Sequence, residues 1–332
     1  MNKRWSILLA GAAVLSLGLA GCGSGSLSGS GDTQNTESSG SADGSLTKVT
    51  VGILPIAPSV AVQQGVDAGT FEKHGLDVEL STSNAGAAML PAVSTGELAI
   101  AVGNPLSVLT AVDKGLDMRI VSGYSASKAE GNDINGVVVR KDSGIDGWDD
   151  LAGKTTTVNA LRTQGDLTIM ESAELAGADP TKLKFSEMPF PDMEAQLERG
   201  NVDAIWVPEP FLSKALTDEN NELLGYPNQT ASPGMPTMVS FTSGKFAEEN
   251  PEVIKQWQEA LAEVLTAAQD DPDSARALLP DFMSMDPKVA EGLNMESWNA
   301  ETPVAELTDL GELAAKFGFL ENVPDINAII IQ

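Results

Sequence analysis

From Lys48 onward, short apolar runs alternate with stretches of helical character, and this alternation limits the fold more than any other feature. Residues 49–54 form an apolar run that Pro55 ends, and residues 76–80 alternate like a half-exposed strand. Further strands are expected at 98–102, 118–122, 136–140, 154–159, 184–188, 203–207 and 237–242, and helices at 59–67, 87–95, 105–114, 165–176, 193–199, 209–216 and 252–269. Strands and helices that alternate over short connections predict an α/β fold with largely parallel sheets.

The first 21 residues are typical of an export signal. Lys3 and Arg4 precede an apolar run over 7–19, which is too short for a membrane span, and small residues follow at 20–21. We interpret residues 1–21 as a signal peptide. Residues 22–47 are rich in Gly and Ser with few apolar side chains, so we expect a flexible tether there.

Leu19-Ala20-Gly21-Cys22 resembles the lipobox of bacterial lipoproteins. The resemblance implies cleavage before Cys22 and a lipid on its sulfur, which places the protein on the extracytoplasmic face of the cell membrane. Cys22 is the only cysteine, so it has no disulfide partner. No second long apolar run follows, and we expect membrane attachment through the lipid alone. An ordinary secreted protein with a chance cysteine is the alternative.

The charge argues against one large class of partner. The chain of 332 residues has a net charge of −27, and loss of Lys3 and Arg4 makes the mature form more acidic still. Such a surface repels phosphate backbones, so we expect no nucleic acid partner. Hydrophobic residues make up 42%, which is enough for most of the chain to fold into one large or two medium domains.

A short internal repeat points to two similar halves. Residues 96–101 (GELAIA) and 200–205 (GNVDAI) each follow an expected helix and lead into a short strand, with prolines just beyond. Between the halves, the polar and turn-rich segment 141–153 is the expected position of the first crossing between domains.

The catalytic and cofactor-binding motifs that the sequence resembles in part are incomplete. Lys154 and Thr155 invite a phosphate-loop interpretation, but Trp148 occupies the position of the first required glycine. His74 is the only histidine, so the usual zinc sets are missing, and no GxSxG elbow supports a serine nucleophile. Nothing singles out a catalytic pair among the 47 acidic residues. We expect no metal, no cofactor and no enzymatic activity.

Four segments together resemble the ABC-transporter solute-binding proteins of the nitrate, sulfonate, taurine and thiamine-precursor (pyrimidine) branch. They are VGILPIAPSVAVQQGVDAGTFEKHGLDVEL, AAMLPAVSTGELAIAVGNP, WDDLAGKTTTVNA and MPFPDMEAQLERGNVDAIWVPEPF. The resemblance covers essentially all of 48–332. It implies a two-lobed periplasmic-binding-protein-like fold of type II, with the ligand in the cleft between the lobes. Lobe 1 would be 48–140 plus 240–332 and lobe 2 would be 141–239, with crossings near 140–143 and 237–242.

Ligands of such open sheets bind in the crevice at the carboxyl ends of the strands. Arg162 is the only basic residue in the loops that follow the expected strands. It precedes a helix expected to start near Gly165, and together they suit a carboxylate or sulfonate. A solvated arginine on the rim is the alternative. Asp166 is expected to cap the helix rather than contact the ligand.

The remaining site candidates are aromatic or polar residues at strand ends. An aromatic wall for a planar ligand is expected from Tyr124, Phe190 and Trp206, with core packing as the alternative. Hydrogen bonds to the ligand are expected from Ser59, Ser83, Asn84, Asn104, Asn159, Asp192 and Glu209, which could equally form turns or begin helices.

The sequence therefore predicts a lipid-anchored solute-binding protein of an ABC importer. The expected ligand is a small organic anion held by Arg162, and the alternative is an amino-pyrimidine bonded by Glu209 or Asp192. The permease and the ATPase would be separate chains, and the family suggests a monomer. A ligand sensor on the same fold is a further alternative. Enzymatic relatives that make a pyrimidine use their own histidine and a Cys-rich motif. This chain has one histidine and one cysteine, and the lipid anchor would occupy that cysteine.

Overall fold

The computed structural model describes residues 45–331. The expected signal peptide, the expected lipidation site Cys22 and nearly all of the expected tether lie outside the described residues. The strands are β1 (Thr47–Ile53), β2 (Leu76–Thr82), β3 (Ile100–Gly103), β4 (Met118–Ala126), β5 (Asn135–Arg140), β6 (Thr155–Val158), β7 (Lys184–Glu187), β8 (Ala204–Pro208), β9 (Asn221–Gly225), β10 (Pro236–Ser243) and β11 (Ser297–Trp298).

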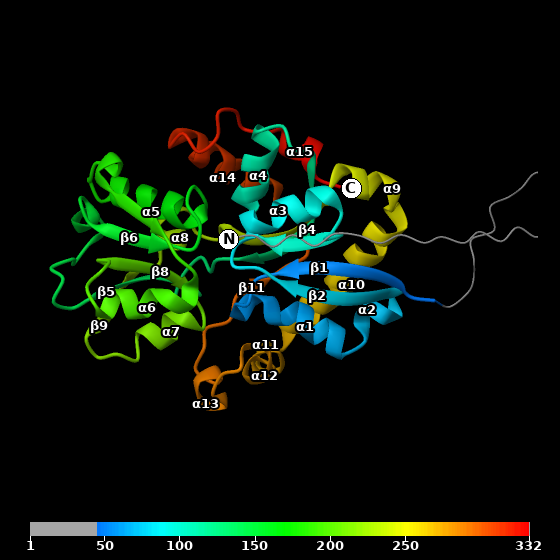
Figure 1. The fold of residues 1–332 in the computed structure, drawn as a ribbon, viewed down its shortest axis with the longest axis horizontal. Helices are drawn as coiled ribbons and strands as arrows, with labels where there is room; N and C mark the ends of the chain where they lie inside the picture. Colours follow the sequence, from blue (N-terminus) through cyan, green and yellow to red (C-terminus); the bar gives the residue numbers. More distant parts are fainter. Residues whose placement is uncertain (1–44, 332) are drawn as a thin grey trace, which may run out of the picture. The chain divides into compact units, whose positions relative to one another are not determined.

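Helices connect and cover these strands (Figure 1). The longer ones are α1 (Val60–Asp67), α3 (Gly86–Thr95), α4 (Pro105–Asp113), α5 (Gln164–Leu175), α6 (Phe190–Glu198), α10 (Pro251–Asp270) and α14 (Val304–Lys316). The shorter ones are α2 (Thr70–Lys73), α7 (Phe211–Ala215), α8 (Pro227–Ala231), α9 (Gly244–Glu249), α11 (Pro272–Ala277), α12 (Leu279–Met283), α13 (Pro287–Ala290) and α15 (Ile326–Ile329), with 3-10 turns η1 (Ala57–Ser59), η2 (Trp148–Leu151) and η3 (Pro180–Lys182). No helix within residues 45–331 combines the length and the apolar character needed to cross a membrane.

The strands form two mixed sheets, one in each of two lobes. The first sheet has the order β11-β4-β10-β3-β1-β2 and the second has the order β7-β6-β8-β5-β9. In the first sheet β1 runs parallel to β2 and β3, while β10 runs antiparallel to β3 and β4. In the second sheet β6 runs parallel to β7 and β8, while β5 runs antiparallel to β8 and β9. Apart from the edge strand β11, the two sheets share one topology, which confirms the two similar halves.

Each sheet receives one strand from the other half of the chain. Strand β5 follows β4 in sequence but joins the second sheet, and β10 follows β9 but joins the first sheet. The structure thus differs from the expected boundaries: residues 135–140 were assigned to lobe 1 but pair in the second sheet, and β10 starts within the segment assigned to lobe 2. The chain passes between the sheets in 127–134 and again in 232–235. The apolar run Val137–Val139 indicates a strand, but a local sequence signal does not indicate which sheet the strand joins.

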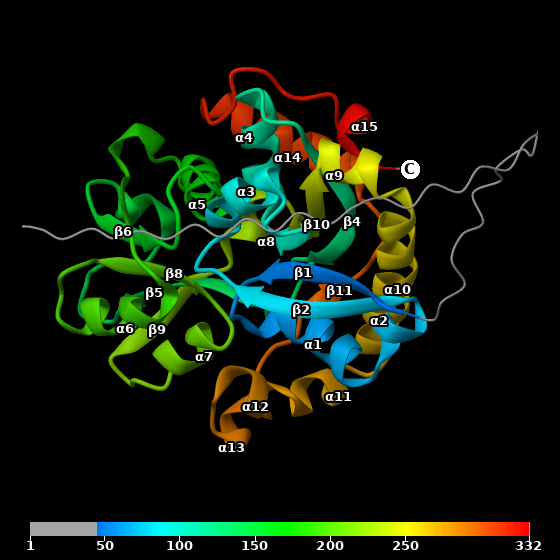
Figure 2. The ribbon, with the colours of Figure 1, turned by 45° about the vertical axis from the view of Figure 1, so that its right-hand side comes forward.

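The core of the first lobe lies on both faces of its sheet. Helices α1, α2 and α10 pack together on one face, and α3, α4 and α14 lie on the other (Figures 1 and 2). Trp257 of α10 is fully buried and stacks on Phe71 of α2 with ring centroids 5.1 Å apart. A side chain at Gly65 would place its Cβ 2.4 Å from Val264, so the glycine permits α1 and α10 to approach closely.

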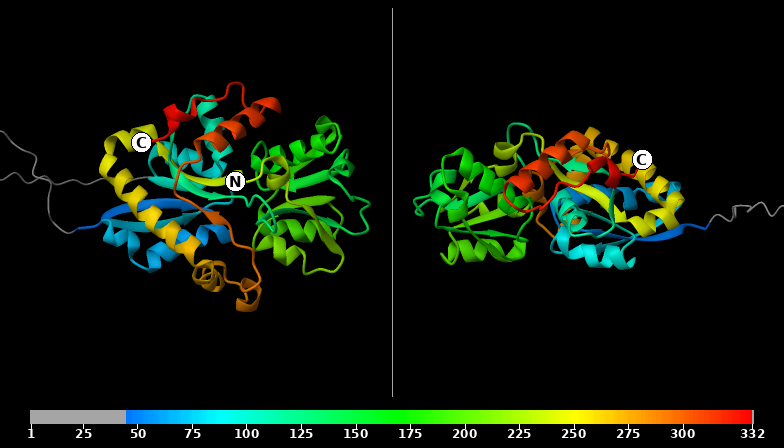
Figure 3. Two further views of the ribbon diagram at one scale, coloured as in Figure 1. Left: turned by 180° about the vertical axis from the view of Figure 1, so that it is seen from behind. Right: turned by 90° about the horizontal axis from the view of Figure 1, so that it is seen from above.

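The second lobe repeats this layering on a smaller scale. Helices α5 and α8 pack on each other, as do α6 and α7, and Figure 3 shows from two further sides how they flank the second sheet. Helix α5 begins at Gln164 with Thr163 as its N-cap residue, and Asp166 completes a capping box by accepting from Thr163 N at 2.8 Å. Asp166 thus belongs to the cap as expected, although as its third helical residue rather than the N-cap itself.

Candidate functional site

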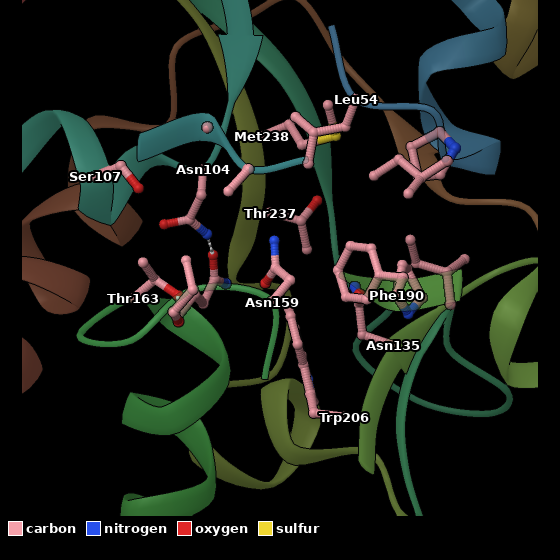
Figure 4. A pocket seen from close by; sticks show the side chains of 18 of the residues that line it. Leu54, Asn104, Ser107, Asn135, Asn159, Thr163, Phe190, Trp206, Thr237 and Met238 are labelled. Atoms are coloured by element: carbon pink, nitrogen blue, oxygen red, sulfur yellow. Dashed lines mark hydrogen bonds between the residues drawn. The ribbon is translucent and has the colours of Figure 1, made fainter. Parts of the chain in front are cut away.

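A pocket lies where the carboxyl ends of the parallel strands of both sheets meet (Figure 4). The first lobe contributes Leu54 after β1, Gly86 at the start of α3, Asn104 after β3, Met238 on β10 and Glu296 before β11. The second lobe contributes Asn159 after β6, Gln164 of α5, Phe190 of α6, Trp206 of β8 and Asn228 of α8. The enclosed volume is about 60 Å³. The walls are largely apolar, with polar side chains set among them, which is the usual composition of a small-molecule site.

Hydrogen bonds join the two lobes across the pocket. The side chain of Asn104 caps α4 by accepting from Leu106 N at 2.9 Å, and its Nδ2 donates to Gln164 Oε1, as Figure 4 shows. Gln164 is 2% exposed, and its Nε2 donates to Pro236 O at 3.0 Å. Asn159 Nδ2 donates to Asn84 O at 3.2 Å. These bonds hold the lobes closed over the pocket.

Several buried polar atoms that line the pocket have no hydrogen-bond partner among the described residues. They are Ser107 Oγ, Trp206 Nε1, both amide atoms of Asn228, and Glu296 Oε2. Each of these residues is at most 8% exposed. Buried polar groups in proteins are nearly always satisfied, so such a group needs an explanation. A bound solute with both donors and acceptors would supply the missing partners.

Glu296 is the only acidic residue among the described residues that line the pocket, and no Lys, Arg or His lines it. Its Oε1 accepts from Thr237 Oγ1 at 2.6 Å. Burial raises the pKa of Glu296 to about 8, with the neighbouring hydroxyl groups of Ser125 and Thr237 opposing the rise and the negative charge of Asp133 adding to it. The site therefore holds a carboxyl group that is mostly neutral at pH 7.

Asp166, two residues after the pocket residue Gln164, also has a shifted pKa. Burial raises its pKa to about 6, while the backbone N–H groups of Arg162 and Thr163 donate to its carboxylate and oppose the rise. Its role is to cap α5 and so to fix Gln164 at the pocket. No cluster of three or more His, Cys, Asp or Glu within residues 45–331 is arranged to hold a metal ion.

Four of the predicted site residues line the pocket: Asn104, Asn159, Phe190 and Trp206. The rings of Phe190 and Trp206 are in contact, with centroids 6.0 Å apart and planes inclined by 48°. They form one aromatic wall of the pocket rather than two faces of a sandwich. Direct contact of these four residues with a ligand remains a prediction.

Arg162 does not line the pocket, contrary to the expected anion clamp. Its backbone has φ 57°, in the left-handed region, and its side chain is exposed. Its Nη2 donates to Gly318 O, and its guanidinium lies over the ring of Phe319. The cation thus contacts the end of α14 in the first lobe. The loop pattern placed Arg162 correctly before α5, but it could not show where a long side chain points.

Tyr124 and Glu209 are also outside the pocket, because each has partners in the core. The Tyr124 hydroxyl donates to Pro58 O at 2.8 Å, and the residue is 1% exposed. Glu209 is fully buried; its carboxylate accepts from Ser213 N at 3.0 Å, from Ser213 Oγ at 2.8 Å and from Asn294 Nδ2 at 3.2 Å. Tyr124 is thus packed in the core, and Glu209 bonds the first turn of α7, which agrees with the alternative given for each residue.

The other four predicted residues lie near the pocket without lining it. Asp192 and the side chain of Asn84 are exposed, and the Ser83 hydroxyl donates to Ala85 O at 3.3 Å in a local turn. Ser59 is fully buried with its hydroxyl unpartnered, but it does not line the pocket.

Sequence reasoning missed most of the polar lining. Thr163 and Gln164 lie in the loop 159–165 that was expected at the cleft, so the strand-end rule did locate them. Ser107, Asn135, Asn228, Thr237 and Glu296 lie on helices, on strands or in the C-terminal part, where no strand-end signal exists. Only the packing of distant segments brings them together.

Two α/β lobes with a pocket between them form the fold of periplasmic binding proteins. The description "NMT1/THI5 like" belongs to the family profile that matches residues 61–275, which is more than half of the chain. The chain therefore belongs to the NMT1/THI5-like family. No significant match to a curated protein sequence was found.

Solved structures show the same fold at low sequence identity. The periplasmic aliphatic sulphonate-binding protein SsuA of Escherichia coli is 17% identical with a TM-score of 0.69, covering 86% of this chain and 98% of its own. The alkanesulfonate-binding protein SsuA of Xanthomonas axonopodis, bound to MOPS, is 14% identical with a TM-score of 0.72, covering 86% and 99%. The nitrate-binding protein NrtA of Synechocystis is 13% identical with a TM-score of 0.70, covering 86% and 85%. These likenesses extend over the whole described fold.

Proposed function

We propose that the protein is the solute-binding component of an ABC importer, which captures a small molecule between its lobes and presents it to a permease. The observation that carries the proposal is the pocket itself, which is lined by both lobes and holds unpartnered polar atoms. The fold and the names of the similar structures support an import role. The permease and the ATPase would be separate chains, and the lipid at Cys22 would keep the protein at the extracytoplasmic face of the membrane.

The ligand we propose is a small planar ring with hydrogen-bonding groups, such as an amino-pyrimidine, rather than the organic anion first expected. An anion would lie beside the Glu296 carboxyl group without a basic side chain in the pocket wall to compensate its charge. Phe190 and Trp206 offer aromatic ring surfaces, and Asn228, Ser107 and Glu296 offer free donors and acceptors.

Entry of such a ring requires the lobes to separate. The pocket encloses about 60 Å³, whereas a cavity of about 150 Å³ is known to hold benzene. The bonds from Gln164 and Asn159 to the first lobe would break on opening and form again around the ligand, with the pocket walls displaced to make room for the ring. Closure by a hinge motion is the common mode of two-lobed binding proteins.

Thermal and chemical unfolding of the purified protein against a panel of solutes tests the proposal. The panel contains alkanesulfonates, aromatic and aliphatic carboxylates, and amino-pyrimidines. A specific ligand at about a hundred times its dissociation constant should raise the free energy of unfolding by about 2.7 kcal/mol. Trp206→Ala should lose the effect, while Trp148→Ala, at a partly buried indole that does not line the pocket, serves as the matched control. Absence of stabilisation by every solute would count against solute capture, and turnover of a bound compound would count against a binding role.

A further inference from the structure

The pocket contains a carboxyl group with one oxygen engaged and the other free. Glu296 is 4% exposed; Thr237 donates to its Oε1 at 2.6 Å, while its Oε2 is buried without a partner among the described residues. We propose that Glu296 selects the ligand by sharing one proton between its Oε2 and a weakly basic ring nitrogen of the ligand. This inference deepens the proposed function and rests on it.

The neighbouring hydrogen bonds leave one carboxyl oxygen of Glu296 for the ligand. Thr237 Oγ1 donates to Glu296 Oε1 when the Ser125 hydroxyl, 2.9 Å from it, donates to Thr237. In that arrangement Oε1 is an acceptor, and the proton of the neutral acid resides on Oε2, the free atom. A ligand nitrogen can accept this O–H, or take the proton and donate N–H to the carboxylate. In both states one proton lies between the two atoms, and the pair carries no net charge.

The surrounding charges favour this pairing over an anion. The titratable groups that act on Glu296 are Asp133, in the crossing between β4 and β5, and Tyr124 of β4. Both are acids, and no cationic side chain lines the pocket. A carboxylate or sulfonate would add negative charge to a buried acidic site, and this desolvation cost would remain unbalanced. A weak base adds no charge to the ligand–carboxyl pair.

A shared proton has a characteristic dependence on pH. Burial raises the pKa of Glu296 to about 8, so the free protein holds the proton through the neutral range. Above pH 8 both partners have lost it, and the affinity should fall about tenfold per pH unit. Below the pKa of the ligand both partners are protonated, and the affinity should fall again. The affinity is thus greatest between the two pKa values.

Isothermal titration calorimetry with two ring compounds from pH 5 to pH 9.5 tests the inference. The probes are 4-aminopyrimidine and aniline, which share a six-membered ring and an amino group, but aniline has no ring nitrogen. At pH 7 we expect 4-aminopyrimidine to bind at least tenfold more tightly than aniline. Equal affinity of the two probes overturns the inference.

Three variants separate the proton from the shape of the site. Glu296→Gln keeps the acceptor for Thr237 but cannot give up a proton, so it should bind 4-aminopyrimidine about tenfold more weakly at pH 7 and lose the fall above pH 8. Thr237→Val removes a bond that lowers the pKa of Glu296, so the alkaline fall should move to higher pH. Glu194→Gln, at a carboxylate paired with Lys214 outside the pocket, is the matched control and should behave like the wild type.

The results also distinguish this inference from the proposed function. An alkaline fall that persists unchanged in both pocket variants overturns the role of Glu296. A sulfonate or carboxylate that binds and closes the lobes while 4-aminopyrimidine does not overturns it too, but leaves solute capture intact. Absence of binding by every compound overturns both.

Discussion

The guanidinium carbon of Arg162 lies 4.9 Å from the centroid of the Phe319 ring, so an arginine of the second lobe rests on an aromatic residue of the first. The same side chain donates to Gly318 O. Close by, Lys316 at the end of α14 forms ion pairs with Glu171 and Glu174 of α5. Arg162 thus belongs to a contact between the lobes outside the pocket, where it can influence closure without meeting the ligand.

Arg162→Ala should weaken the binding of every solute by the same small factor. The variant loses an exposed cation–π contact of about 0.5–1 kcal/mol, which favours the closed form and corresponds to a two- to fivefold loss of affinity. Calorimetry with one anionic and one neutral solute measures the two factors. A loss of affinity for the anionic solute alone would instead support the anion site at Arg162 that the sequence predicts.

Gln164→Ala should shift the ligand-free protein toward an open form. The side chain bonds Asn104 and Pro236, and two lost hydrogen bonds of about 0.5–1.5 kcal/mol each make closure less favourable. We expect a larger radius of gyration by small-angle X-ray scattering and an affinity at least fivefold weaker. Gln196→Ala, at a glutamine bonded to Asn201 within the second lobe, is the control and should change neither quantity.

Gly165→Ala should disturb the aromatic wall. A Cβ atom on Gly165 would lie 2.8 Å from Trp206 Cε3, so the indole must move and the pocket must change shape. Overpacking of this kind costs about 1–3 kcal/mol, which a urea unfolding midpoint would detect, and ligand affinity should fall with it. Gly292→Ala, where the nearest atom to the new Cβ is Val289 O at 3.8 Å, should change neither. An unchanged affinity in Gly165→Ala would argue against contact between Trp206 and the ligand.

The stability of the protein should rise as the pH falls from 8 toward 5. Glu296 has a pKa of about 8 in the folded protein and an ordinary value of 4.5, so between these values the folded state holds a proton that the unfolded state lacks. This group alone should add about 1.4 kcal/mol of unfolding free energy per pH unit on acidification. Asp166 acts in the same direction between about 6 and 3.8.

Urea unfolding of the wild type and Glu296→Gln at pH 6, 7 and 8 isolates the contribution of Glu296. The free energy of unfolding of the wild type, relative to that of the variant, should rise by about 1.4 kcal/mol for each pH unit of acidification over this range. A constant difference between the two proteins would mean that Glu296 titrates near its ordinary pKa.

The local elements could be predicted because their signals lie within a few consecutive residues. The helix expected at 252–269 is α10 (Pro251–Asp270), and the strand expected at 154–159 is β6 (Thr155–Val158). Proline, glycine and the spacing of apolar residues determine secondary structure within a few consecutive residues. Strands β9 and β11 were missed, since the first mixes polar with apolar residues and the second has only two residues.

The site could be predicted only in outline. The strand-end rule found Asn104, Asn159, Phe190 and Trp206, because the carboxyl ends of parallel strands share one edge whatever the details of packing. It could not find Glu296 or Asn228, which reach the pocket from segments remote in sequence.

The sequence by itself determined the α/β class, the two similar halves, the family and the elements whose ends carry the pocket. The tertiary structure decided which sheet β5 joins, that Arg162 contacts Phe319 instead of a ligand, and that a buried carboxyl group faces the cavity. Secondary structure follows from short-range periodicity and backbone preferences, which a sequence displays directly. The direction of a long side chain and the burial of a charge depend on contacts between residues that are 59 to 156 positions apart in the sequence, and those contacts exist only after the chain has folded.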